Sequence, residues 1–139
     1  MGVDVGHARI GVALSQGSLA LAHDTVMAGD GAVRAIAQLA SEKTVERIYV
    51  GLPLSLAGNH TSSTEMALQF ARELSKNSAA EVMLIDERLS TVSSSRLLRQ
   101  AGKSSKEAKS IIDSESARAI LNFALEAPET AQSIGEFDA

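Results

Sequence analysis

The sequence of 139 residues contains no cysteine, only two prolines and only 3% aromatic residues. Without cysteine, the chain has no disulfide framework and no thiolate metal site, which favours a reducing compartment. No apolar run approaches the roughly 18 residues of a membrane span, and the first residues lack the basic start and apolar centre of a secretory signal. We therefore expect a single-domain cytoplasmic protein without membrane contact.

The charge is mildly acidic overall and unevenly distributed. Seventeen acidic residues against thirteen lysines and arginines give a net charge of −4, which argues against a histone-like nucleic-acid binder. Residues 88–118 nevertheless carry about +4, whereas residues 126–139 hold four acids and no base. Because aromatic side chains are scarce, a base-stacking platform is excluded. If nucleic acid is the partner, the basic segment should contact its backbone.

Hydrophobic periodicity predicts three strands followed by strands that alternate with helices. The expected strands are at 1–5, 9–15, 19–26, 48–50 and 82–85, and the expected helices are at 32–42, from a capping box at 62–65, at 92–101 and at 113–125. Residues 103–110 are polar and basic, and we expect a loop there. Right-handed crossovers would place the later strands parallel to the first. This layout predicts an α/β, ribonuclease H-like fold: a mixed five-stranded sheet, with a three-strand antiparallel meander plus two parallel strands and helices on both faces.

Asp4 is a carboxylate inside an apolar strand, between Val3 and Val5. Burying it without a partner would cost several kcal/mol, so it needs hydrogen-bond donors or a cation. One alternative is that Asp4 caps the following turn through backbone N–H groups. The other is that it binds a metal ion, since Gly6 leaves room for an ion or a phosphate to approach.

Three further acids stand at the ends of predicted elements. Asp86 and Glu87 close the last predicted strand, and only one of them should face the same side as Asp4 because side chains alternate along a strand. The alternative for this pair is a surface ion pair with Arg88. Asp113 begins the last predicted helix, where capping the helix and binding a metal are both compatible with its position.

These acids together point to metal chemistry. If Asp4, one member of the 86–87 pair and Asp113 converge, they form an oxygen-rich site of the kind that Mg²⁺ or Mn²⁺ prefers. Two such ions about 4 Å apart would stabilise the attacking water and the leaving oxygen of a phosphodiester. The sequence has no Walker loop and no dinucleotide fingerprint.

Four stretches that span nearly the whole chain carry a family resemblance. They are Gly2–Gly6 with Arg9–Ala13, Val50–Leu54 with Gly58, Ile85–Thr91, and Asp113–Ser114 with Ala117, Ile120 and Leu121. In this order they resemble the YqgF/RuvX family, the Holliday-junction-resolvase-like nucleases linked to maturation of the small-subunit ribosomal RNA precursor. One departure is Gln16, which stands where an acid often follows the serine. The chain also begins very close to its first strand, so its true start could lie upstream.

The resemblance implies a divalent-metal nuclease. The catalytic acids would be Asp4, Glu87 and Asp113, and these three together with Asp86 are the candidate metal ligands, Glu87 being favoured slightly over Asp86. The residues expected to contact a nucleic-acid backbone are Arg9, Arg88, Thr91, Arg96, Lys103, Lys106 and Lys109. The nuclease domain would cover residues 1–127, and we expect the acidic tail at 128–139 to be disordered.

The resemblance also implies a substrate, which the residues alone leave open. The expected function is phosphodiester hydrolysis in 5′-end processing of pre-16S rRNA. Resolution of Holliday junctions in recombination and repair, and non-catalytic nucleic-acid binding in ribosome assembly, remain alternatives. A sugar-kinase or actin-like ATPase lobe also opens with Asp-x-Gly, but that machinery needs two lobes. The expected partners are structured rRNA precursor or branched DNA and ribosomal particles, with the chain as a monomer or a weak homodimer.

Overall fold

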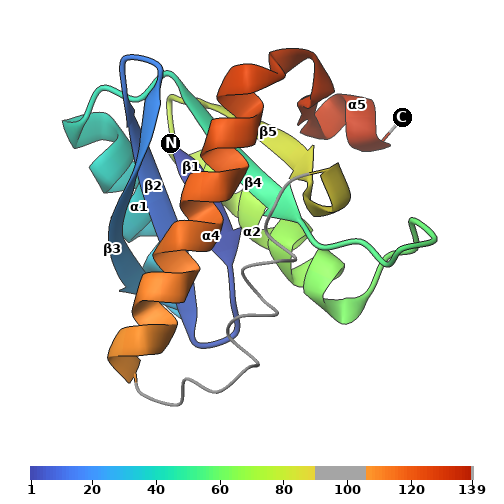
Figure 1. The fold of residues 1–139 in the computed structure, drawn as a ribbon, viewed down its shortest axis with the longest axis horizontal. Helices are drawn as coiled ribbons and strands as arrows, with labels where there is room; N and C mark the ends of the chain where they lie inside the picture. The colour runs from blue at the N-terminus through green and yellow to red at the C-terminus, as the bar shows by residue number, and fades with distance from the viewer. Residues whose placement is uncertain (90–105, 139) are drawn as a thin grey trace.

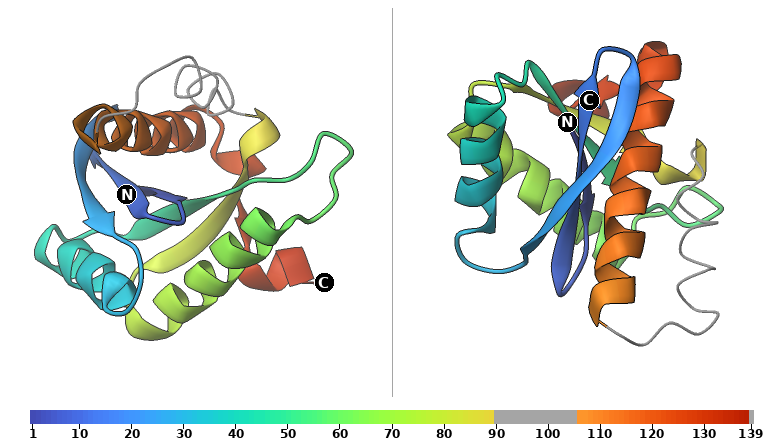
Figure 2. Two further views of the ribbon diagram at one scale, coloured as in Figure 1. Left: turned by 90° about the horizontal axis from the view of Figure 1, so that it is seen from below. Right: turned by 60° about the vertical axis from the view of Figure 1, so that its left-hand side comes forward.

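The computed structural model describes residues 1–89 and 106–138, and side chains at 106–110 lie outside that description. A six-stranded sheet lies between helix α4 on one face and helices α1 and α2 on the other (Figures 1 and 2). The strands are β1 (Gly2–Val5), β2 (Arg9–Gln16), β3 (Leu19–Met27), β4 (Arg47–Leu52), β5 (Glu81–Asp86) and β6 (Gln132–Ser133). The helices are α1 (Ala32–Glu42), α2 (Ser62–Asn77), α4 (Lys106–Glu126) and α5 (Ile134–Asp138), with 3₁₀ turns η1 (Glu87–Leu89) and η2 (Pro128–Thr130). Within these ranges, no helix is both long and apolar enough to cross a bilayer.

The sheet has the predicted antiparallel meander and the predicted parallel strands. The strand order is β3-β2-β1-β4-β5-β6, with β1, β2 and β3 antiparallel and with β4 and β5 parallel to β1. The prediction of five strands is wrong, because β6 pairs antiparallel with β5 at Met83 and Leu84. Both crossovers run through helices on one face, and among the described residues α4 is the helix that covers the opposite face.

The C-terminal segment contradicts the prediction of a disordered tail at 128–139, because residues 128–138 form η2, β6 and α5. Ile134 and Phe137 pack against the core between the sheet and α2, and the Phe137 ring stacks on His60 with centroids 5.4 Å apart. The prediction of disorder rested on the acidic charge of the segment. It did not take account of Ile134 and Phe137, whose side chains hold the segment against the core.

Strand alternation divides the core into two layers. Along β1 and β4, Val3 and Val50 face α1 and α2, whereas Tyr49 faces α4. The α4 layer is completed by Ile85 from β5 and Ile120 from the helix. The sheet is therefore buried on both faces, as the continuous apolar run of β4 indicates.

Two helices begin earlier than the sequence predicts. α4 begins at Lys106 and not at Asp113, because the stretch at 106–110 has good helix formers where we expected a loop. α2 begins after Thr61, whose side chain and that of Thr64 each accept from the other residue's backbone N–H. This capping box lies one residue before the predicted one. The helix predicted at 92–101 lies outside the described residues.

Glycines allow α4 to lie directly on the sheet. A Cβ atom at Gly11 of β2 would be 2.0 Å from the carbonyl oxygen of Asp113, and one at Gly2 of β1 would be 2.6 Å from that of Ala117. Real Cβ atoms essentially never come so close, so the helix backbone occupies the space that side chains would fill. The position of α4 over β1 and β2 depends on these two glycines.

Gly11→Ala is expected to lower the free energy of unfolding by about 3 kcal/mol, because the added methyl group must push α4 off the sheet. Urea denaturation measures this change. Gly135→Ala in α5 is the matched control, since its Cβ would meet only the Ser133 hydroxyl at 3.9 Å. Equal stability of the Gly11→Ala variant and the unmodified protein would contradict the close approach of the helix.

Candidate active site

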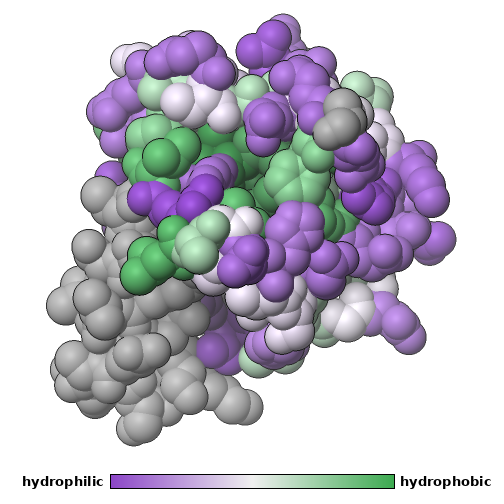
Figure 3. All heavy atoms as spheres, turned by 90° about the vertical axis from the view of Figure 1, so that its right-hand side faces the viewer, coloured by the Kyte–Doolittle hydropathy of each residue, from purple (hydrophilic) through white to green (hydrophobic). Residues whose placement is uncertain are grey.

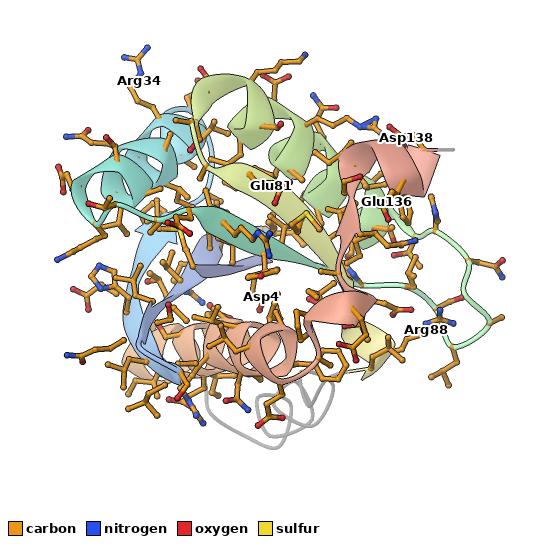
Figure 4. All side chains as sticks on the ribbon, turned by 90° about the horizontal axis from the view of Figure 1, so that it is seen from above. Asp4, Arg34, Glu81, Arg88, Glu136 and Asp138 are labelled. Atoms are coloured by element: carbon orange, nitrogen blue, oxygen red, sulfur yellow. The ribbon has the colours of Figure 1, made fainter. Side chains whose placement is uncertain are left out.

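Asp4 lies in a row of residues that crosses the sheet beneath α4. Its antiparallel partner on β2 is Gly11. The parallel pairing of Val3 with Val50, continued by one residue, places Gly51 of β4 on the other side of Asp4. The Asp4 side chain points from the sheet toward α4 (Figure 4) and is only 5% exposed. With glycine on both sides, the space around this carboxylate is open to groups from other elements.

Glu87 of η1 reaches the same space from the end of β5. A Cβ atom at Gly51 would be 2.7 Å from Oε1 of Glu87 and 2.5 Å from Cδ1 of Ile120. The Glu87 side chain therefore folds over Gly51 against α4, and it is only 4% exposed. Of the two neighbouring acids, Glu87 is the one that lies on the Asp4 side of the sheet.

Asp86 forms an ion pair with Arg88 instead. The Arg88 side chain donates from Nη2 to Oδ2 of Asp86 at 2.6 Å, and its backbone N–H donates to Oδ1 at 2.9 Å. Burial acts to raise the pKa of Asp86, but these hydrogen bonds and the charge of Arg88 outweigh it and lower that pKa below its ordinary value. The surface ion pair that sequence reasoning considered for the acidic pair is therefore found at Asp86.

Asp113 lies in the third turn of α4, so the prediction that it begins a helix is wrong. Its carboxylate is almost fully buried and accepts a hydrogen bond from Nε of Arg9 on β2, 3.1 Å from Oδ2. Since Arg9 and Gly11 are two residues apart on the same strand, they share the α4 side of the sheet. The ion pair thus holds the Asp113 carboxylate near the C-terminal end of β1.

Three buried carboxylates from β1, η1 and α4 thus lie on one side of the sheet, and none of them is without a partner. Within residues 1–89 and 111–138, no three acidic or histidine side chains are grouped so that all three could hold one metal ion. Mg²⁺ is usually bound by one or two carboxylates, because waters and substrate phosphates complete its shell. This donor set fits such an ion, and the missing side chains at Gly11 and Gly51 let the Asp113 backbone and the Glu87 side chain lie on either side of the Asp4 position.

The rim of this region is formed by η1 and the loop between β4 and α2. Nη1 of Arg88 donates to the carbonyl oxygen of Leu56 at 3.3 Å, and the Leu56 side chain is almost fully exposed. The Thr64 hydroxyl donates to the carbonyl of Pro53 and fixes the start of the loop. Figure 4 shows Arg88 at this loop, away from Asp4, and Figure 3 shows apolar side chains among hydrophilic ones on this face.

Five of the predicted nucleic-acid contacts lie wholly or partly outside the described residues. Thr91, Arg96 and Lys103 lie outside the described residues, and Lys106 and Lys109 belong to the first turn of α4 with side chains outside that description.

Two serines of α4 are buried: Ser114, which belongs to a stretch of the family resemblance, and Ser116, which the sequence analysis did not identify. The Ser114 hydroxyl donates to the carbonyl oxygen of His23 at 2.6 Å. Ser116 is fully buried, and its hydroxyl has no hydrogen-bond partner among the described residues. Ser116 follows Asp113 by three residues and precedes Ile120 by four, a spacing that puts all three on one helix face. The sequence could have indicated Ser116 only through this spacing, and the spacing has meaning only if Asp113 lies inside the helix.

Comparison with known proteins gives close relatives. The model of the RuvX family, described as Holliday junction resolvase, matches residues 1–127. A protein of Leifsonia xyli named as a pre-16S rRNA nuclease is 46% identical over 131 residues, covering 91% of this chain and 84% of that protein. A protein of Methylobacillus flagellatus with the same name is 39% identical, covering 87% of this chain and 86% of the relative.

Solved structures share the fold at low sequence identity. T. thermophilus RuvC in complex with a Holliday junction substrate superimposes with a TM-score of 0.58 and 18% identity, covering 95% of this chain and 96% of RuvC. A second structure of Thermus thermophilus RuvC gives a TM-score of 0.51 at 14% identity, covering 95% and 97% of the two chains. The predicted ribonuclease H-like fold is thereby confirmed.

The Asp86–Arg88 pair predicts a specific pH dependence of stability. Because the pKa of Asp86 is lowered in the folded protein, the pair stabilises it above the unfolded pKa of about 3.9. This contribution is lost as the pH falls through the folded pKa. Asp86→Asn should cost at most about 1 kcal/mol at pH 7, since the pair is partly exposed. In thermal denaturation, the difference in stability between Asp86→Asn and the unmodified protein should become smaller as the pH is lowered toward 3. A difference in stability that stays constant with pH would contradict this account.

Proposed function

The chain belongs to the RuvX family of phosphodiester-cleaving nucleases, and we propose that it is a divalent-metal-dependent enzyme that acts in 5′-end processing of pre-16S rRNA. The observation that carries this proposal is the gathering of Asp4, Glu87 and Asp113, all buried, on one side of a ribonuclease H-like sheet. Three separate elements supply them, so no single local structure explains their burial.

In the proposed mechanism, Asp4 and Glu87 hold the cation, Mg²⁺ or Mn²⁺, and Asp113 contributes the third carboxylate. When bound, such a cation activates water for attack and stabilises the negative charge that develops on the leaving oxygen. Arg9 keeps the Asp113 side chain directed at the site through its 3.1 Å hydrogen bond. Gly51, beside Asp4, leaves room for the Glu87 carboxylate to lie over the sheet.

The names of the relatives favour RNA as the substrate. Several proteins that are 37–46% identical over most of this chain are named as pre-16S rRNA nucleases. The likeness to the RuvC–junction complex, at 18% identity, supports the fold and leaves branched DNA as an alternative substrate. We place the nuclease domain in residues 1–127 and the protein in the cytoplasm with ribosomal precursor particles, as a monomer or a weak homodimer.

The free-energy cost of burying three carboxylates argues against a purely structural role in ribosome assembly. Burying a carboxylate is expensive unless it is paired, and an apolar residue of similar size would usually serve stability better. A non-catalytic binding protein gains nothing from three buried acids beneath one helix. Metal binding gives each of them a reason to be retained.

Asp4→Asn tests the catalytic proposal, with Asp86→Asn as the matched control. Cleavage of pre-16S rRNA and of a four-way DNA junction is measured with Mg²⁺ or Mn²⁺. We expect Asp4→Asn to lower the rate by at least about 100-fold, because it removes charge at the metal site. Asp86→Asn should stay within a few-fold of the unmodified protein, because that carboxylate pairs with Arg88.

Two results would contradict the proposal. Equal losses in the two variants would mean that Asp4 has no special part in the reaction. Failure of the unmodified protein to cleave either substrate would favour the assembly-factor alternative.

Arg88 is proposed to contact the nucleic-acid backbone from the rim of the site. Arg88→Ala should weaken binding of a pre-16S rRNA fragment and reduce the slope of log K against log salt by about 1. Arg47→Ala is the control: Arg47 also pairs with an acid, Glu81, but lies at the start of β4, the opposite end of the parallel strands. Filter binding across a salt series measures both slopes. An unchanged slope for Arg88→Ala would remove Arg88 from the interface.

A further inference from the structure

Ser116 is a fully buried serine whose hydroxyl has no hydrogen-bond partner among the described residues. Serine inside a helix commonly returns its hydrogen bond to the backbone carbonyl one turn earlier, but this hydroxyl makes no such bond. A buried polar group left without a partner costs about 1–3 kcal/mol relative to a paired one. Such a group in a native protein needs an explanation, and a functional role or a bound molecule is the usual one.

The surroundings of Ser116 are those of the three carboxylates. α4 crosses the row of residues that contains Asp4, with the Asp113 backbone over Gly11 on one side of Asp4 and the Ile120 side chain over Gly51 on the other. Since Ser116 lies between Asp113 and Ile120 on the same helix face, it is placed over the Asp4 position. The hydroxyl therefore belongs to the buried layer that also holds Glu87.

Ser114 shows that the helix itself does not require an unpaired hydroxyl. It is also buried on α4, two residues earlier, but its hydroxyl donates to the His23 carbonyl at 2.6 Å. The two serines therefore share residue type, helix and burial and differ in having a partner. Alanine at position 116 would fill nearly the same space without an unpaired polar atom.

We propose that Ser116 is a positioning residue of the metal site, whose hydroxyl hydrogen-bonds a water molecule that enters the site with the divalent cation. This inference rests on the proposed function, because it requires a cation at Asp4 and Glu87. In this proposal, the water molecule supplies the hydrogen-bond partner that the Ser116 hydroxyl lacks among the described residues. Residues that orient a metal's surroundings in this way typically change metal affinity by 10- to 100-fold when they are removed.

The test compares Ser116→Ala with Ser114→Ala in the full chain. Two quantities are measured: the melting temperature of the metal-free protein and the Mn²⁺ dissociation constant from isothermal titration calorimetry. Ser116→Ala should leave the melting temperature unchanged or raise it by a few degrees, while the dissociation constant rises at least tenfold. Ser114→Ala should lower the melting temperature and leave the dissociation constant within twofold.

The outcomes separate this inference from the function on which it rests. If the unmodified protein binds Mn²⁺ and Ser116→Ala binds it equally well, the role of Ser116 is wrong and the metal site stands. If Ser116→Ala instead lowers the melting temperature as Ser114→Ala does, the hydroxyl has a structural partner and the inference is also overturned. If the unmodified protein binds no Mn²⁺, the metal site itself falls and the role of Ser116 falls with it.

Discussion

The contact between α4 and the sheet is the constraint on which the site depends. Because positions 2 and 11 are glycine, the backbone of α4 occupies the space that side chains would otherwise fill. This close approach brings Asp113 within hydrogen-bond distance of Arg9. At Gly51 the same absence of a side chain admits Glu87. Residues with larger side chains at these three places would hold the helix away from the sheet and separate the carboxylates. The geometry of the acids is therefore set by residues that themselves have no chemistry.

The burial of the acids and the packing of the helix act against each other. Charged groups in a closed layer are costly, and each of the three carboxylates has a partner accordingly. The Ser116 hydroxyl, which has no hydrogen-bond partner in the described part of the chain, lies in the same layer and adds to that cost. Sites that bind ions commonly keep such locally unfavourable arrangements, because a more stable packing would remove the function. The larger hydrophobic core on the opposite face of the sheet, between the strands and helices α1 and α2, supplies the compensating stability.

Most of the fold could be predicted from the sequence, because alternation along strands and helical spacing reflect burial directly. The strands β1 to β5, α1 and the family membership were predicted, whereas the errors lie where tertiary contacts decide. The sequence predicts a helix start at Asp113 because aspartate is a good N-cap, but the preceding polar residues extend the helix. The charge of the acidic tail predicts disorder, although Ile134 and Phe137 anchor it. The sequence does not show where β5 ends, so it could not decide whether Asp86 or Glu87 faces Asp4. The role of Ser116 could not be predicted because its burial depends on how α4 packs on the sheet.

The central claim is that acids distant in the chain meet beneath α4 to hold a divalent cation, and locating that cation is its most direct test. A crystal structure of the protein grown with Mn²⁺ and measured at a wavelength where manganese scatters anomalously would show the ion's position. We predict an anomalous difference peak on the α4 side of the sheet, within coordination distance of both Asp4 and Glu87. A peak at Asp86 instead, or none near Asp4 at saturating Mn²⁺, would contradict the account.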